Sequence, residues 1–241
     1  MREVLEAIEA VDWDDLPGPS DLYDPARAAT GLRALATATG LVPAADAGSL
    51  LAGGGLVHDH SGTVFPAAVV AAPCLLAIAR HGHPEAGATA LGLFDDALAF
   101  ATRDGSTRVA TPYAEAVPIC CALADHLRGG ADLLAARGRE GKRLLADAAE
   151  HWRFDVQEAV VEGEGVAAFG ILAGRFPDGT PAAELHRAGR VAPLERVVLH
   201  YPPEVYGGSD ACLSVDGVRP DELAPPAVLF PARCGPGPTA G

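Results

Sequence analysis

Aromatic residues are scarce in this chain: they make up only 5% of its 241 residues, although apolar residues together make up 49%. That apolar content is too high for a disordered chain. A β-sandwich is disfavoured because Ala and Leu dominate here in place of Tyr, Trp, Val and Ile. The length suffices for one large domain or two small ones, and the composition favours helices packed through small side chains.

Long hydrophobic runs are also missing. The nearest candidate, residues 64–79, contains Pro66 and Pro73 and is shorter than the ~20 residues that a membrane-spanning helix needs. Acidic side chains stand at Glu3 and Glu6, where a signal peptide has a basic segment followed by an apolar one. We therefore expect a cytoplasmic protein without a membrane partner.

Positive charge is in short supply, with 18 Lys and Arg against 32 Asp and Glu and a formal net charge of −14. An acidic surface repels the phosphates of nucleic acids and of anionic membranes, so neither is an expected partner. The same charge would steer a basic protein toward this chain.

The five cysteines form no Cys-x-x-Cys pair and are odd in number: Cys74, Cys120, Cys121, Cys212 and Cys234. This pattern argues against a disulfide framework and for a reducing compartment. Cys120 and Cys121 lie in an apolar run without an obvious basic neighbour, which predicts an inert role in the core.

Helical patterns account for most of residues 1–153. Asp24-Pro25 is a good helix start, because Asp caps the first turn and Pro fits its first position. The most regular pattern runs from Phe65 to Arg80, with Thr63 or Ser61 as its expected cap. Further helices are predicted over residues 2–10, 24–40, 44–51, 84–101, 111–127 and from 130 to about 152.

Two of these predicted helices align with each other. Pro73 matches Pro118, 45 positions further on, and each segment carries an earlier proline, Pro66 or Pro112. The spacing lies within the ~40–47-residue period of HEAT and armadillo repeats, and a proline inside a helix bends it. We therefore predict a mainly α fold of HEAT/armadillo-like stacked helical hairpins over residues 1–153.

The segment Gly62-Thr63-Val64-Phe65-Pro66-Ala67-Ala68, followed by Ala72-Pro73-Cys74-Leu75-Leu76, resembles uncharacterised HEAT-repeat-like proteins of high-GC, actinobacterial-type bacteria. The resemblance covers roughly residues 20–150. It implies a helical solenoid with an interaction role, and it supplies no functional residues.

Residues 154–235 change character and predict a small β-rich region. Short apolar or alternating segments, separated by Gly and Pro turns, fit an antiparallel sheet. The predicted strands cover residues 154–161, 165–172, 196–201, 211–215 and 227–230. Residues 236–241 are predicted to form a disordered tail.

Two His-x-His pairs, His58/His60 and His81/His83, are the sharpest candidates for chemistry, since imidazoles ligate zinc and similar metals. A helix of about 16 residues separates the pairs by roughly 24 Å, so they would not share one site. Asp59 stands beside the first pair. Imidazoles also titrate near neutrality, which leaves a pH-responsive contact open.

Other chemical patterns are weak, because the chain contains neither a G-x-S-x-G elbow nor a P-loop. We predict a non-catalytic helical-repeat protein that binds a basic protein partner, as an immunity-type or regulatory inhibitor, with no catalytic residue and no cofactor. The alternatives are a metal-dependent hydrolase built on the His58/His60 loop and a ligand sensor that uses the C-terminal region. The expected partner-binding residues are His58, Asp59, His60, His81, His83, Asp95 and Asp96.

Overall fold

A computed structural model describes residues 1–104, 107–162, 165–203 and 209–234. The chain forms two compact units. The helical unit comprises residues 1–108 and 122–146, and the sheet unit comprises residues 109–121 and the chain from 147 onward. The predicted disordered tail at 236–241 lies outside the described residues.

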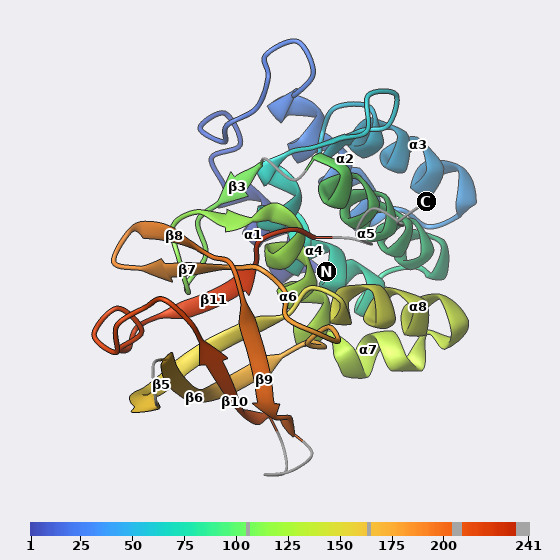
Figure 1. Ribbon diagram of the computed structural model, residues 1–241. Helices are drawn as coiled ribbons and strands as arrows, with labels where there is room; N and C mark the ends of the chain where they lie inside the picture. Colours follow the sequence, from blue (N-terminus) through green and yellow to red (C-terminus); the bar gives the residue numbers. More distant parts are fainter. Residues whose placement is uncertain (105–106, 163–164, 204–208, 235–241) are drawn as a thin grey trace, which may run out of the picture. The chain divides into compact units, whose positions relative to one another are not determined.

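The helical unit contains five successive helices and, further along the chain, one short helix and most of another, which Figure 1 shows in colours from blue to yellow. Their bounds are α1 (Arg2–Glu9), α2 (Pro25–Thr37), α3 (Leu41–Ala52), α4 (Pro66–His81), α5 (Pro84–Asp104), α7 (Ala131–Ala136) and α8 (Gly138–Ala149). A short hairpin of β1 (Val57–His58) and β2 (Thr63–Val64) joins α3 to α4. The helix α6 (Ile119–Gly129) begins in the sheet unit and ends in the helical unit.

Local chemistry explains where these helices start. The Asp24 carboxylate accepts hydrogen bonds from the amides of Ala26 and Arg27 at 3.0 and 3.2 Å, so the predicted cap of α2 is confirmed. The predicted helix over residues 65–80 is confirmed as α4, but its predicted cap is wrong. The hydroxyls of Ser61 and Thr63 bond to each other at 2.8 Å, and no side chain caps α4.

The sheet unit is built on a seven-stranded antiparallel sheet with strand order β8-β7-β11-β5-β6-β10-β9 (Figure 1). The strands are β5 (Arg153–Glu162), β6 (Gly165–Ala173), β7 (Ala183–Arg187), β8 (Arg190–Leu194), β9 (Val197–Tyr201), β10 (Asp210–Val215) and β11 (Val228–Pro231). β8 lies at one edge and carries Pro193, which stands opposite Glu184 of β7. One face of the sheet buries an apolar core that includes Trp152, Phe154 and Leu229.

This sheet makes the predicted fold class wrong: the chain is not a mainly α HEAT/armadillo solenoid with a small β segment. The five predicted strands correspond to β5, β6, β9, β10 and β11, but they belong to a sheet that also contains β7 and β8. The sheet has a core of its own, so it is a full layer of structure rather than an appendage.

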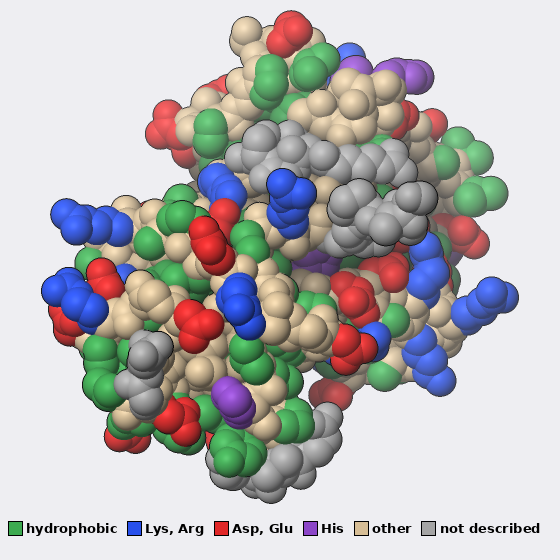
Figure 2. Space-filling model, viewed as in Figure 1, with side chains coloured by type: hydrophobic (Ala, Val, Ile, Leu, Met, Phe, Trp, Pro, Cys, Tyr) green, Lys and Arg blue, Asp and Glu red, His purple; other side chains and the backbone are tan. Residues whose placement is uncertain are grey.

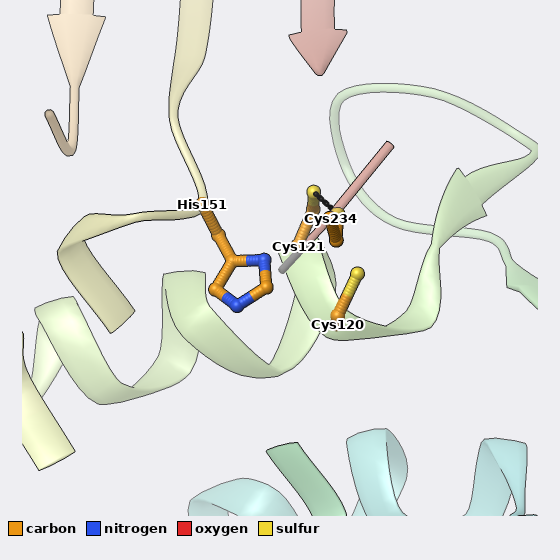
Figure 3. A group of neighbouring side chains, drawn as sticks. All are labelled: Cys120, Cys121, His151 and Cys234. Atoms are coloured by element: carbon orange, nitrogen blue, oxygen red, sulfur yellow. Dashed lines mark hydrogen bonds between the residues drawn. The ribbon is translucent and has the colours of Figure 1, made fainter. Parts of the chain in front are cut away.

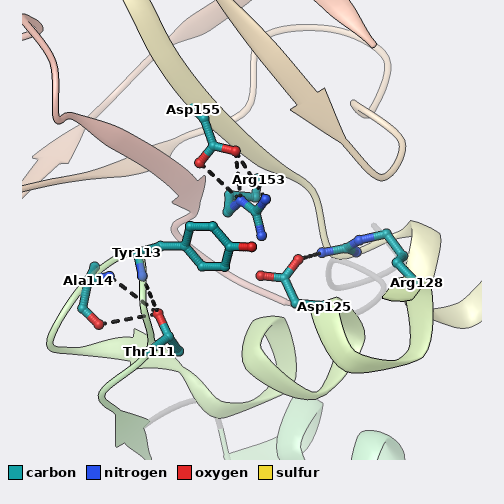
Figure 4. Close-up of polar contacts among 7 residues, drawn as sticks. All are labelled: Thr111, Tyr113, Ala114, Asp125, Arg128, Arg153 and Asp155. Atoms are coloured by element: carbon teal, nitrogen blue, oxygen red, sulfur yellow. Dashed lines mark hydrogen bonds and ion pairs between the residues drawn. The ribbon is translucent and has the colours of Figure 1, made fainter. Parts of the chain in front are cut away.

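The predicted repeat fails at its second copy, because residues 111–118 are not helical. The Thr111 hydroxyl accepts hydrogen bonds from the amides of Tyr113 and Ala114, and this turn replaces a helix start (Figure 4). Pro118 ends the strand β4 (Val117–Pro118), which pairs with β3 (Arg108–Val109). Pro73, by contrast, lies inside α4. The two prolines therefore occupy different structures. In the described ranges of the chain, none of the helices is long and apolar enough to cross a membrane.

Candidate metal centre

Four side chains with metal-binding atoms converge in the sheet unit: Cys120, Cys121, His151 and Cys234 (Figure 3). Each offers one ligand atom, and these atoms all lie within 4.8 Å of one another. Within the described residues, this is the one group of three or more His, Cys, Asp or Glu side chains close enough to hold a metal ion.

Three separate segments deliver these ligands. Cys120 and Cys121 are the second and third residues of α6, which begins directly after Pro118 ends β4. His151 lies in the short connection between α8 and β5. Cys234 follows the last strand, β11. Two of the ligands therefore sit in the first turn of a helix, where the helix dipole favours a negatively charged thiolate.

The group is sheltered from solvent except at one side chain. Cys120 and Cys121 are 1% exposed and His151 is 2% exposed, whereas Cys234 is partly exposed. The Sγ atoms of Cys121 and Cys234 are 3.3 Å apart. Cys234 is therefore the most accessible of the four side chains.

Hydrogen bonds within the group shift the pKa values of two of its thiols in opposite directions. The pKa of Cys120 is lowered, first by hydrogen bonds with Cys121 and Cys234 and then, against the effect of burial, by the His151 imidazole. The pKa of Cys121 is raised well above its ordinary value by its hydrogen bonds with Cys120 and Cys234 and by burial. The arrangement thus favours one thiolate, at Cys120, held by the neighbouring donors.

The geometry and the ligand set fit a tetrahedral zinc site. Zinc binds thiolate sulfur at ~2.3 Å, so two sulfurs at the corners of a tetrahedron lie about 3.8 Å apart. The separation of 3.3 Å between Cys121 and Cys234 and the upper limit of 4.8 Å bracket that value. Three thiols and one imidazole form a set typical of structural zinc sites, which leave no coordination position open.

The other two cysteines show what an isolated buried thiol looks like in this chain. Cys74 and Cys212 are buried, and burial raises the pKa of each. Neither belongs to a group of metal ligands in the described part of the chain. Their surroundings are those of a cysteine that packs as a small hydrophobe.

The sequence did not reveal the centre, because its ligands are far apart in the chain. The sequence predicts an inert core role for Cys120 and Cys121 because it shows no basic neighbour, and the fold supplies that neighbour as His151. The adjacent cysteine pair was the one local signal. Neither His151 nor Cys234 stands at a spacing from it that matches a known zinc motif.

The predicted site residues are only partly brought together. His58, Asp59, His60 and Asp96 line an open cavity of about 640 Å³ in the helical unit. The Nδ1 atom of His58 lies 2.8 Å from the hydroxyl of Ser61. The pKa of Asp96 is raised by burial and by the charges of neighbouring carboxylates.

The remaining predicted residues lie outside that cavity lining. Asp95 forms an ion pair with Arg143 at 2.5 Å. His81 and His83 stand at the turn between α4 and α5, where the Nδ1 of His83 accepts a hydrogen bond from a backbone amide. Within the described residues, no group of three or more metal ligands forms around His58 and His60.

Comparison with known proteins found no match to this chain among family models, curated proteins or solved structures.

Proposed function

We propose that this protein binds a thiophilic metal ion, Zn²⁺ in the first instance, through Cys120, Cys121, His151 and Cys234. One observation carries the proposal: four soft ligand atoms from three distant segments converge within 4.8 Å in a sheltered site. Thiolate and imidazole select zinc and copper over magnesium and calcium.

The proposed role of the metal is structural. Four protein ligands complete a tetrahedron, which leaves no position for a substrate or an activated water. The ion would join the first turn of α6 to the α8–β5 connection and to the residue that follows β11. Because these segments separate on unfolding, metal binding would add directly to the stability of the sheet unit.

Charge and acidity support binding at neutral pH. Metal ligation requires deprotonated thiols, and each proton that must leave weakens binding. Hydrogen bonds from Cys121 and Cys234 already lower the pKa of Cys120, so one ligand is available as a thiolate at little cost. The metal charge would then deprotonate the other two thiols.

Metal analysis of protein purified without a histidine tag tests the proposal. We expect about one equivalent of zinc per chain, and a Co²⁺-substituted form with the visible bands of tetrahedral thiolate coordination. Cys121→Ser should lower the zinc content at least tenfold. Cys212→Ser is the matched control, because Cys212 is a buried cysteine of the same unit outside the group.

Two results would contradict the proposal. One is wild-type protein that contains less than a tenth of an equivalent and takes up no Zn²⁺ or Co²⁺ on titration. The other is a Cys121→Ser variant that binds as much metal as Cys212→Ser. Circular dichroism of both variants establishes that they are folded, so that lost binding is not mistaken for lost structure.

A further inference from the structure

We infer that the same centre responds to oxidants: in the metal-free protein, a hydroperoxide converts Cys121 and Cys234 to a disulfide. The disulfide itself follows from the sulfur geometry. Its consequence, exclusion of the metal, rests on the proposed function.

The two sulfurs are already in contact. Their separation of 3.3 Å exceeds a disulfide bond of ~2.05 Å by about 1.3 Å, a gap that small side-chain rotations can close. The dashed line in Figure 3 marks this contact.

The competing pair, Cys120 and Cys121, is disfavoured by the backbone. Neighbouring Cα atoms across a trans peptide are ~3.8 Å apart, whereas disulfides span about 4.4–6.8 Å between Cα atoms. A bond between adjacent residues would therefore be strained. Cys234, 113 positions from Cys121, is free of that constraint.

Exposure sets the order of the two chemical steps. Cys234 is partly exposed and Cys121 is 1% exposed, so the hydroperoxide reaches Cys234 first. The Cys234 sulfur attacks the peroxide bond, which breaks to give a sulfenic acid and one molecule of alcohol or water. The Cys121 sulfur then displaces the hydroxyl from the sulfenic sulfur, and the proton of the Cys121 thiol leaves with that hydroxyl as water. Two sulfurs lose one electron each, and the hydroperoxide accepts both.

The product cannot bind zinc with four ligands. A disulfide removes Cys121 and Cys234 from the ligand set and leaves Cys120 and His151. A bound metal has the opposite effect, because sulfurs that coordinate it are shielded from the peroxide. Oxidation and metal binding therefore exclude each other at this site.

The test is peroxide treatment of chelator-stripped protein, followed by alkylation, trypsin and mass spectrometry. Cleavage after Arg128 and Arg233 puts Cys121 and Cys234 in different peptides. We expect one linked pair of these peptides, which persists in Cys120→Ser and disappears in Cys121→Ser. Free thiols should fall from five to three. Zinc-loaded protein should oxidise at least tenfold more slowly.

The outcomes separate this inference from the proposed function. A protein that binds zinc but forms no linked peptide, or loses the link in Cys120→Ser, overturns the inference alone. A protein that forms the link but takes up no zinc supports the disulfide and overturns the metal proposal. Zinc uptake by the oxidised protein equal to that of the reduced protein would refute the mutual exclusion.

Discussion

Replacing Arg153 by Met tests how the segments of the sheet unit are held together. The Arg153 guanidinium lies 3.6 Å from the centre of the Tyr113 ring (Figure 4). It also donates to both carboxylate oxygens of Asp155 at 3.0–3.1 Å. Tyr113 precedes the helix that carries Cys120, and Arg153 follows His151. The contact therefore joins two of the segments that carry the proposed metal ligands.

The expected cost follows from burial. The side chain of Arg153 is 10% exposed and that of Asp155 is 29% exposed, so their paired hydrogen bonds are worth about 1.5 kcal/mol. The cation–π contact adds about 1 kcal/mol, because Tyr113 remains partly exposed. We expect Arg153→Met to lower the free energy of unfolding of the sheet unit by about 2–3 kcal/mol.

The two tryptophans make the measurement specific to one unit. Trp13 belongs to the helical unit and Trp152 to the sheet unit, and the chain has no other tryptophan. In a Trp13→Phe background, urea unfolding followed by fluorescence reports on the sheet unit through Trp152. Both the reference protein and the Arg153→Met variant are measured in this background.

Arg175→Met is the matched control. Arg175 pairs with Glu150 at 2.9 Å in the same unit, but both side chains are more than half exposed. An exposed ion pair contributes about 0–1 kcal/mol. Equal losses in the two variants would refute the claim that burial makes the Arg153 contacts valuable. An Arg153→Met/Tyr113→Leu double-mutant cycle measures the cation–π contribution separately.

Three further substitutions have calculable outcomes. Burial and nearby carboxylates raise the pKa of Tyr23 to about 12, above the unfolded value near 10. Between pH 10 and pH 12 the folded state therefore keeps the Tyr23 proton that the unfolded state loses. The free energy of unfolding should fall by up to about 2.7 kcal/mol over this range. Urea unfolding at several pH values should show a smaller fall in the free energy of unfolding of Tyr23→Phe. In Gly170→Ala, the new Cβ would collide with the backbone oxygen of Asp155 in the paired strand, so we expect a loss of about 3 kcal/mol in the Trp152 assay. Gly92→Ala, in helix α5 with open space around the added Cβ, should instead gain up to about 1 kcal/mol of stability, measured by Trp13 fluorescence. A loss of stability would show that the added methyl group does not fit at Gly92.

The sequence predicts the first five helices well because their apolar patterns are local, and two of them also have local start signals. Asp24-Pro25 and Pro84 act within one helical turn, and the helices that follow them are confirmed. The failure at Thr111 has a local cause too: the same Thr-Pro pair that can begin a helix can also form a hydroxyl-bonded turn. In the structure, the turn at Thr111 is followed by β4, which pairs with β3. The sequence pattern does not show that pairing, so it does not distinguish the turn from a helix start.

The sequence does not predict the two strands β7 and β8, so the predicted sheet is smaller than the sheet in the structure. β7 and β8 are short, and β8 exposes four of its five residues, so its apolar pattern is weak. The four side chains of the candidate metal centre come from three segments that are far apart in the sequence, and sequence pattern does not report how such segments meet. The prediction of a basic protein partner remains a prediction: acidic and basic side chains are interspersed over the face shown in Figure 2. Pull-down from lysate at low and high salt would test it.

The proline in β8 has a consequence for self-association. An edge strand normally presents unpaired amide hydrogens that invite a strand from another molecule. Pro193 has no amide hydrogen to offer, and Arg190 and Arg187 place positive charge at the adjacent turn. Pro193 therefore removes one amide donor from β8, which disfavours the pairing of this edge with a strand of another molecule.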